Sequence, residues 1–586
     1  MKSQIFSFLS VLGLLAMANP APGQSSVRGP LPPEARAKPY LFQPFTPERW
    51  DASSFAPPKA FDWWREARFG MFIHFGVSSL RGVELGWGRG THLPPDGGKG
   101  PIPDEVYDNL YKDFKIENFD AKEWVRIARD AGVKYVILIT KHHDGFHMWD
   151  TAFSDYKITN AAFGRDYVKE VVDACHEAKM PIGFYFAQRE WYHPQYNPTG
   201  KDPTRDHRKY IEYEFNAVRE LLTKYGKIDV LWFDAAWWNG MFLEENWDSE
   251  KLYRMARELQ PDILINNRAS IPGDFDTPEQ HLGSFQNNRP WESCITMLAS
   301  NSWAYNPKSG PKPLKQLIQL IVGAATGDGN CLLNVGPRAD GTIQPSETER
   351  LHEIGEWMRK YGQTIYGTRG GPYLNGAWGG STHKGNKIWI HLLDGKGNVR
   401  LGPLPYRVKS AKALTGGEVA IQSTGEALIL NVPTEFRDPM DTIIELTVDE
   451  EVPDTRVVGG NIANWDDQSK YGKVLNLLGG MNDSPAGEVP AWSQTDLGKS
   501  YKVNAVGIHG HKDESLKGLS LSISTDGKKW EKVWTAPDNS GSWIAEVSRI
   551  QAGAYVMGLP ARYLRFESGV GKAGKIGIER LEVYGE

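Results

Sequence analysis

Short apolar strands alternate with amphipathic helical patterns through the middle of the chain. The expected strands cover residues 71–75, 135–140, 181–187, 229–234, 262–267 and 331–335, and the expected helices cover 121–132, 165–179, 208–225, 249–259 and 313–325. Such alternation is typical of parallel β/α units. The number of units, and the lack of a GxGxxG motif after the first strand, favour a closed (β/α)8 barrel over an open doubly wound sheet.

The expected barrel covers residues 59–373, and two all-β segments follow it. Residues 374–450 contain short strands separated by turn residues, which favours a β-sandwich. A charged, proline-containing stretch at 449–454 is typical of a linker. Residues 456–586 form a last segment, again with strand–turn–strand patterns. The sequence thus predicts three folded domains.

The first residues have the pattern of a secretory signal peptide. Lys2 precedes an apolar run from Ile5 to Met17, and Ala16-Met17-Ala18 is a small-residue cleavage pattern. The run is too short to span a membrane, so no membrane span is expected. We therefore expect a signal peptide over residues 1–18, a loose lead-in over 19–58, and a secreted or periplasmic protein.

Composition excludes several classes of protein. The three cysteines, Cys175, Cys294 and Cys331, provide neither a paired disulfide framework nor zinc-ligand spacing. With 67 basic and 72 acidic residues the net charge is -5, which leaves no electrostatic footprint for a nucleic acid.

Polar side chains end nearly every expected strand. In (β/α)8 barrels the catalytic groups lie at the carboxyl ends of the strands. One polar loop residue means little, but here the same placement recurs strand after strand. These polar residues are His74, His142, His143, Tyr185, Asp234, Arg268, Glu279 and Asn334, with Trp87 and Trp232 nearby.

Glycoside hydrolysis is the chemistry that these residues fit best. His142 and His143 are adjacent, without an HxH or HExxH pattern, so no metal site is expected. There is also no GxSxG motif and no phosphate-binding loop. Asp234 after an apolar strand and Glu279 on a later loop provide the nucleophile and acid/base pair that glycosidases use. The alternatives are a helix cap for Asp234 and a surface charge for Glu279.

Several motifs resemble those of the α-L-fucosidases of glycoside hydrolase family 29. They are FGMFIHFG (69–76), KHHDGF (141–146), VLWFDAAWW (230–238), TPEQ (277–280), PWESC (290–294), NSWAYN (301–306) and GNCLLNVGPRADGTI (329–343). The resemblance implies a somewhat irregular barrel that releases terminal α-L-fucose, with retention, through a covalent glycosyl-aspartate. It assigns the nucleophile to Asp234 and the acid/base to Glu279, and it implies no cofactor for catalysis.

The same resemblance implies the residues that contact the sugar. They are His74, Trp87, His142, His143, Tyr185, Trp232 and Arg268. Many family members place a glutamate directly before the tryptophan that matches Trp87, whereas this chain has Gly86 and its nearest acid is Glu84. Glu292 is a further candidate carboxylate for the sugar; its alternative is a structural partner of an arginine.

The last segment resembles discoidin-type modules, which include the family 32 carbohydrate-binding modules. Such modules often bind galactose-like sugars and hold a structural calcium ion. Its candidate sugar contacts are Trp465, His509, His511, Lys512 and Trp543, and a packing role alone is the alternative.

The sequence therefore predicts a secreted retaining exo-α-L-fucosidase that acts on fucosylated oligo- or polysaccharides. Two alternatives stay open. One is a glycosidase for a related L-galacto-configured substrate, such as an α-L-galactosidase or a sulfated-fucan hydrolase. The other is a non-catalytic glycan-binding protein. The oligomeric state is not predicted.

Overall fold

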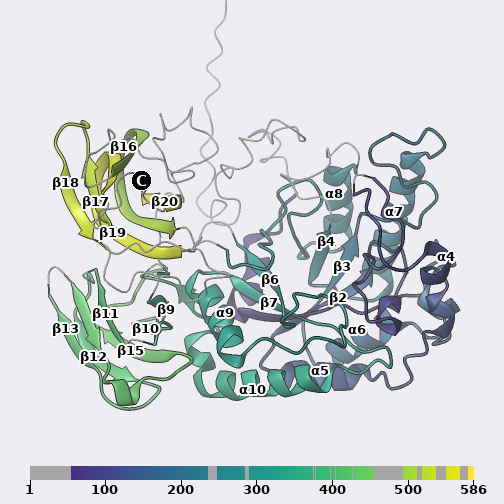
Figure 1. Cartoon of the computed structure of the whole chain (residues 1–586), viewed down its shortest axis with the longest axis horizontal. Helices are drawn as coiled ribbons and strands as arrows, with labels where there is room; N and C mark the ends of the chain where they lie inside the picture. The colour runs from purple at the N-terminus through teal and green to yellow at the C-terminus, as the bar shows by residue number, and fades with distance from the viewer. Residues whose placement is uncertain are drawn as a thin grey trace, which may run out of the picture.

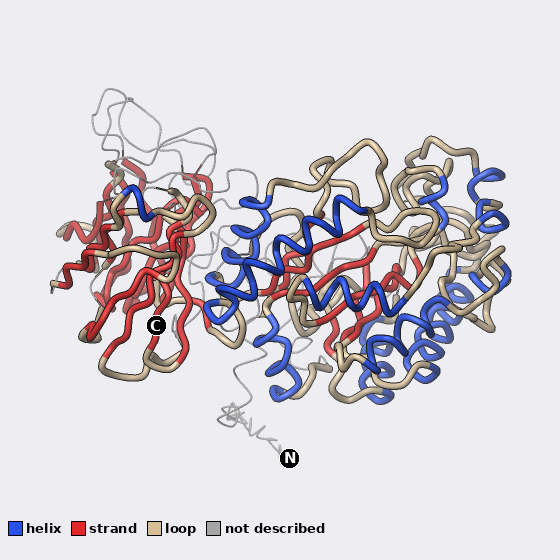
Figure 2. Tube along the Cα trace, turned by 90° about the horizontal axis from the view of Figure 1, so that it is seen from below, coloured by secondary structure: helices blue, strands red, loops and turns tan. Residues whose placement is uncertain are grey.

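The chain contains a barrel followed by two β-sheet domains that lie at one end of it (Figures 1 and 2). The computed structural model describes residues 54–454 and 492–585, with gaps at 95, 235–246, 284–289, 374, 377, 396, 403, 425–426, 511–517, 536–549 and 568–577. The expected signal peptide, residues 1–18, and the lead-in up to residue 53 lie outside the described residues.

Within the described residues, the barrel sheet has seven strands in the order β5-β4-β3-β2-β1-β7-β6, and every pairing is parallel. The strands are β1 (Phe69–Ile73), β2 (Tyr135–Lys141), β3 (Ile182–Ala187), β4 (Val230–Asp234), β5 (Leu264–Ile265), β6 (Glu292–Thr296) and β7 (Asn330–Val335). The residues of β1, β2, β3 and β7 are buried along their whole length, as in a parallel sheet covered on both faces.

An irregular segment closes this sheet into a barrel. Phe275 forms a parallel bridge with Asn266, directly after β5. Farther along, Glu279 forms a parallel bridge with Cys294 of β6, whose amide donates to the Pro278 carbonyl at 3.0 Å. Residues 275–280 thus occupy the place of an eighth strand, which confirms the expected (β/α)8-like fold and makes its closure irregular.

Helices alternate with the strands and cover the outside of the barrel (Figure 1). They are α3 (Asp62–Ala67), α4 (Asp104–Tyr107), α5 (Ala121–Asp130), α6 (Tyr167–Glu177), α7 (His207–Lys224), α8 (Ser249–Leu259), α9 (Leu314–Thr326) and α10 (Pro345–Tyr361). Aspartate side chains cap the first turns of α5, α6 and α7, which satisfies amide groups that have no partner inside the helix. In α5 the buried residues recur with the spacing of an amphipathic helix.

The second domain is a β-sandwich that packs on the barrel. Its sheets have the orders β12-β15-β10-β9-β8 and β11-β14-β13. The strands are β8 (Arg369–Gly370), β9 (Gly379–Lys384), β10 (Lys387–Leu392), β11 (Asn398–Leu401), β12 (Val408–Ala413), β13 (Ala420–Ser423), β14 (Leu428–Asn431) and β15 (Thr442–Val448). Gln319 of α9 joins the two domains, because its amide donates to the carbonyls of Leu393 and Met440 at 2.9 and 3.0 Å.

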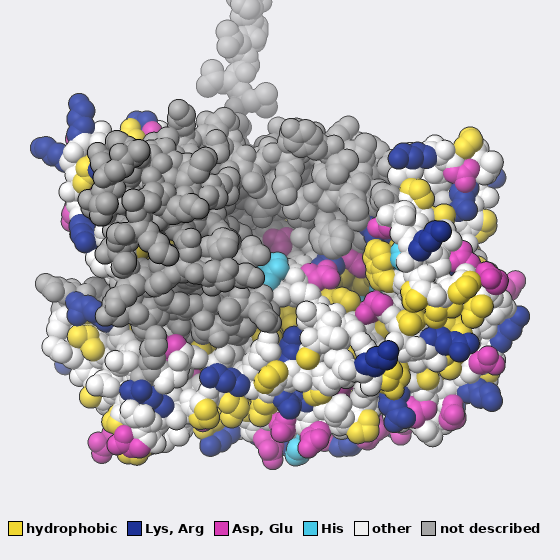
Figure 3. Space-filling model, viewed as in Figure 1, with side chains coloured by type: hydrophobic (Ala, Val, Ile, Leu, Met, Phe, Trp, Pro, Cys, Tyr) yellow, Lys and Arg dark blue, Asp and Glu magenta, His cyan; other side chains and the backbone are white. Residues whose placement is uncertain are grey.

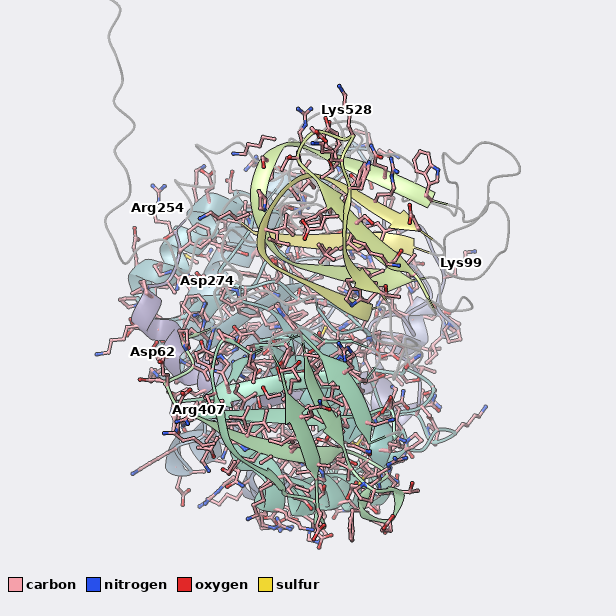
Figure 4. The ribbon with its side chains drawn as sticks, turned by 90° about the vertical axis from the view of Figure 1, so that its left-hand side faces the viewer. Asp62, Lys99, Arg254, Asp274, Arg407 and Lys528 are labelled. Atoms are coloured by element: carbon pink, nitrogen blue, oxygen red, sulfur yellow. The ribbon has the colours of Figure 1, made fainter. Side chains whose placement is uncertain are left out.

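The third domain is an antiparallel sheet in the order β18-β17-β19-β16-β20. Its strands are β16 (Trp492–Gly510), β17 (Ser520–Ser524), β18 (Glu531–Thr535), β19 (Ile550–Glu567) and β20 (Ile578–Gly585). Leu521, Leu564 and Phe566 belong to its own hydrophobic core. Figure 4 shows Lys528 at the outer end of this domain, above the sandwich that carries Arg407. The predicted sugar contacts Trp465, His509, His511, Lys512 and Trp543 lie outside the described side chains.

Acidic and basic side chains are interspersed over the lower part of the face in Figure 3, as the nearly balanced charge suggests. None of the helices in the described ranges combines the length and apolar composition needed to cross a lipid bilayer.

The close packing of α10 on α5 yields a test of the fold. A Cβ atom added at Gly355 would lie 1.9 Å from the Asp130 carbonyl oxygen. In an exposed helix Gly→Ala stabilises by up to about 1 kcal/mol. Gly355→Ala should instead destabilise the barrel by about 2 kcal/mol, because the packed helices have to separate. Denaturant unfolding followed by tryptophan fluorescence measures this, and Glu349→Ala on the exposed face of α10 is the control. A Gly355→Ala protein at least as stable as the wild type would contradict the packing.

Candidate active site

A cavity opens at the carboxyl ends of the barrel strands. His74 directly follows β1, His142 and His143 follow β2, and Asp234 is the last residue of β4. The residues that line the cavity are Phe72, His74, Glu84, Trp87, His142, His143, Tyr185, Arg189, Trp232, Asp234, Arg268, Glu279, Cys294 and Trp303. The structure thus brings together every residue predicted for the site except Glu292.

Arg268 holds both candidate carboxylates. Its Nη1 donates to Oδ1 of Asp234 at 2.9 Å, and its Nη2 lies 2.9 Å from Oε2 of Glu279. The guanidinium lies over the Trp232 ring, 4.6 Å from the ring centroid. Its side chain is only 2% exposed, so water screens these ion pairs weakly.

Asp234 is held in its ionised form. The Tyr185 hydroxyl donates to Oδ2 of Asp234 at 2.7 Å, beside the hydrogen bond from Arg268. Burial by itself raises the pKa of Asp234, but the charge and hydrogen bond of Arg268 and the hydroxyl of Tyr185 outweigh it. The pKa therefore lies below its ordinary value, and the carboxylate is an anion at neutral pH.

Glu279 lies on the segment that closes the barrel. Asp274 (labelled in Figure 4) anchors the start of this segment, because its buried carboxylate accepts from the amides of Ala56 and Ile265, both at 2.7 Å. The turn before it requires glycine: Gly273 has a φ of +60°, and an added Cβ would lie 2.0 Å from the Asn266 carbonyl oxygen.

The two carboxylates differ in their access to solvent. The Glu279 side chain is 35% exposed and that of Asp234 is 14% exposed. The Asp234 carboxylate is therefore the more enclosed of the two, and the Glu279 carboxylate is the more accessible to water.

The three histidines of the cavity are neutral. Burial lowers the pKa of His74 to about 3 and lowers those of His142 and His143 well below the ordinary value. They can exchange hydrogen bonds with a ligand without adding charge to the cavity.

Glu292 does not reach the cavity. It is the first residue of β6, so it lies at the amino end of that strand. Its carboxylate is fully buried and accepts from the Tyr135 hydroxyl and from Nε1 of Trp232, the latter at 3.1 Å. Burial raises the pKa of Glu292 to about 7. In this position Glu292 supports Trp232 from behind, and neither the expected sugar contact nor the alternative partnership with an arginine is seen.

Five residues that line the cavity were not predicted for the site. They are Phe72, Glu84, Arg189, Cys294 and Trp303. Cys294 and Trp303 stand in the motifs PWESC and NSWAYN, so the sequence carries a signal for them without indicating a role. Arg189 follows the end of β3, where the rule about strand ends could have found it.

Glu84, two residues before Gly86, lines the cavity. Its Oε2 accepts from the Trp303 amide at 3.0 Å, and its Oε1 accepts from the Ala304 amide at 2.9 Å. Burial raises the pKa of Glu84, partly opposed by these hydrogen bonds. Glu84 is therefore a third acidic residue that lines the cavity, in addition to Asp234 and Glu279.

Comparison with known proteins agrees with this geometry. The family model described as α-L-fucosidase matches residues 43–363, and one described as a NedA-like, galactose-binding domain matches residues 481–566. A curated α-L-fucosidase from Dictyostelium discoideum is 29% identical over 350 residues, which cover 54% of this chain and 74% of that protein. Human plasma α-L-fucosidase is 28% identical over 334 residues, covering 52% of this chain and 69% of that protein.

Solved structures show the same relationship. An α-L-fucosidase isoenzyme from Paenibacillus thiaminolyticus matches with a TM-score of 0.60 and 37% identity, over 67% of this chain and 99% of that one. A family 29 α-L-fucosidase from Bacteroides thetaiotaomicron, solved as a trapped covalent intermediate, matches with a TM-score of 0.59 and 26% identity, over 67% and 97% of the two chains. The chain is thus a glycoside hydrolase that belongs to the α-L-fucosidase family.

Proposed function

We propose that the protein is a retaining exo-α-L-fucosidase in which Asp234 is the nucleophile and Glu279 the acid/base. The observation that carries the proposal is the buried Arg268 guanidinium, which holds both carboxylates at one end of a cavity. A retaining glycosidase needs such a pair, with one carboxylate ionised and the other in contact with water.

The reaction proceeds in two displacements. Asp234 attacks the anomeric carbon, the glycosidic C–O bond breaks, and Glu279 gives its proton to the leaving oxygen. Glu279 then takes a proton from a water molecule, which attacks the same carbon and releases the Asp234 carboxylate together with the sugar. The relative from Bacteroides thetaiotaomicron, solved as a covalent intermediate with 2-fluoro-fucosyl fluoride, supports this scheme.

The cavity suits a terminal 6-deoxy sugar. Phe72, Trp232 and Trp303 offer apolar surface for a ring face and a methyl group, while His74, His142 and His143 offer polar ring atoms to hydroxyls. The alternative of a non-catalytic glycan-binding protein is disfavoured, because such a protein has no need for an ionised carboxylate beside a second acid.

The flanking segments support two further parts of the proposal. The signal-peptide pattern supports secretion or export to the periplasm. The match to a galactose-binding domain supports a sugar-binding role for the C-terminal module on fucosylated glycans. No group of three or more His, Cys, Asp or Glu side chains converges in the described part of the chain, so the structural calcium ion expected for such a module stays a prediction.

The function is tested by the stereochemistry of the first product. On 4-nitrophenyl α-L-fucoside, proton NMR at early times should show α-L-fucose, because two inversions at one carbon give retention. The matching α-L-galactoside serves as the comparison substrate and should react more slowly. β-L-Fucose as the first product would overturn the proposed retaining mechanism. Faster hydrolysis of the galactoside would overturn the proposed preference for fucose.

Replacing Asp234 should remove turnover but leave the fold intact. Asp234→Gly should lower kcat at least ~1,000-fold, which corresponds to about 4 kcal/mol of transition-state stabilisation. Added azide should partly restore turnover and give the β-azide. The matched control is Asp229→Gly at the amino end of the same strand, where the buried carboxylate accepts from the Ile182 amide at 3.1 Å. That variant should lose stability and keep most of its kcat; near-wild-type kcat in folded Asp234→Gly would refute the assignment.

The role of Glu279 is tested by the leaving group. Glu279→Gln should slow the release of fucose from oligosaccharides far more than from aryl fucosides with acidic phenols, which depart with little protonation. Glu292→Gln is the control, since its carboxylate is sealed behind Trp232 and should affect all leaving groups alike. If Glu292→Gln instead showed the dependence on the leaving group and Glu279→Gln did not, the acid/base role would belong to Glu292.

A further inference from the structure

The His74 imidazole is held by a residue that does not line the cavity. Asn334 on β7 approaches Nδ1 of His74 with its Oδ1 at 2.5 Å, and its Nδ2 donates to the Trp303 carbonyl at 2.7 Å. A carbonyl oxygen only accepts hydrogen bonds, so the amide nitrogen of Asn334 faces Trp303 and its oxygen faces His74. Nδ1 of His74 must therefore carry a proton.

The Trp303 carbonyl that orients Asn334 is itself fixed. The Glu84 carboxylate accepts from the amides of Trp303 and Ala304 and so ties this loop to the loop after β1. The Trp303 ring also packs against His74, with 4.9 Å between the ring centroids. The amide of Asn334 thus has one satisfactory orientation, and reversing it would place two acceptors against each other.

The second ring nitrogen of His74 faces the cavity. A neutral imidazole with its proton on Nδ1 has a lone pair on Nε2. Among the described residues, Nε2 has no hydrogen-bond partner. It is also absent from the buried polar atoms that lack a partner, so it is accessible to solvent. His74 lines the cavity, so this accessible nitrogen faces it. The charged groups near the ring are Asp234 and Arg268, and its polar ring neighbours are His142 and Tyr185.

We propose, on the basis of the function proposed above, that Asn334 is a positioning residue that fixes His74 as a hydrogen-bond acceptor for one hydroxyl of the sugar. The substrate must then bring a free hydroxyl to Nε2. A deoxy sugar lacks the donor, and an O-methylated or O-sulfated sugar has exchanged it for a group that cannot donate. The cavity should therefore reject fucosides modified at one particular ring position.

Asn334→Leu removes the acceptor for Nδ1, and Asn330→Leu is its matched control. Asn330 is the first residue of the same strand, is buried to the same degree, does not line the cavity, and donates to the Trp64 carbonyl at 2.9 Å and to the Tyr135 hydroxyl at 3.3 Å. The substrates are 4-nitrophenyl α-L-fucosides carrying a deoxy or O-methyl group at position 2, 3 or 4. The wild type should discriminate against one position by roughly 10- to 100-fold in kcat/KM. Asn334→Leu should lose most of that discrimination, and Asn330→Leu should keep it.

The pH profile gives a second measurement. Asn334→Asp places a carboxylate against Nδ1, which raises the pKa of His74 because it favours the imidazolium form. As the pH falls, Nε2 is then protonated earlier and stops accepting, so kcat/KM on the unmodified fucoside should fall at a higher pH than in the wild type. Asn330→Asp should leave the acid side of the profile unchanged.

The outcomes separate this inference from the proposed function. No hydrolysis of any fucoside by the wild type would mean that the function itself is wrong. The role of Asn334 would be overturned if the wild type is active but the Asn334 and Asn330 variants lose activity equally on every substrate and their pH profiles are unchanged. Nitrogen NMR of the histidine-labelled wild type, with His74→Gln for assignment, checks the tautomer without any Asn334 variant, and a proton on Nε2 at neutral pH would overturn it as well.

Discussion

The contact of one buried guanidinium with two carboxylates determines the rest of the site. Removing the Arg268 guanidinium from water is costly, and its ion pairs and hydrogen bonds offset that cost. Asp234 and Glu279 take the two amino groups. Thr277 accepts from Nε at 2.7 Å and, through its carbonyl, from Nη2 at 3.0 Å, while the Trp232 ring covers one face. The position of Arg268 therefore links β4, the segment after β5 and the barrel interior.

This linkage explains why the irregular segment of the barrel also carries a residue of the candidate active site. A regular eighth strand would alternate its side chains between two faces and place them by its pleat. Residues 275–280 instead follow the tight turn at Gly273 and form only isolated bridges to β5 and β6. The segment is held by side chains, by Asp274 at its start and by Arg268 on Thr277, so Glu279 can reach the same guanidinium as Asp234.

The sequence predicts the regular half of this arrangement well and the irregular half poorly. β1, β2, β3, β4 and β7 are near-continuous apolar runs, so the rule that catalytic groups lie at strand ends correctly assigns His74, Tyr185 and Asp234 to one cavity. β6 has the sequence Glu-Ser-Cys-Ile-Thr, which lacks an apolar run, so its start cannot be recognised from the pattern. Without that start the depth of Glu292 in the barrel is unknown, and its expected contact with the sugar was wrong for this reason. Helix α10 is not predicted either, because its buried positions include Glu347 and Gly355 among polar residues.

The loop after β1 has Gly86 directly before Trp87, where many family members have a glutamate. Gly86 has a φ of +71°, and an added Cβ would lie 2.7 Å from Nδ1 of His142. Its amide donates to the Tyr107 hydroxyl at 3.0 Å, which holds the backbone close to the histidine pair. A side chain at position 86 would push this loop away from His142, whereas Glu84 turns its carboxylate into the same cavity from two residues earlier. An acidic residue thus lines the cavity although no glutamate stands directly before Trp87, and the amides of Trp303 and Ala304 fix its carboxylate in place.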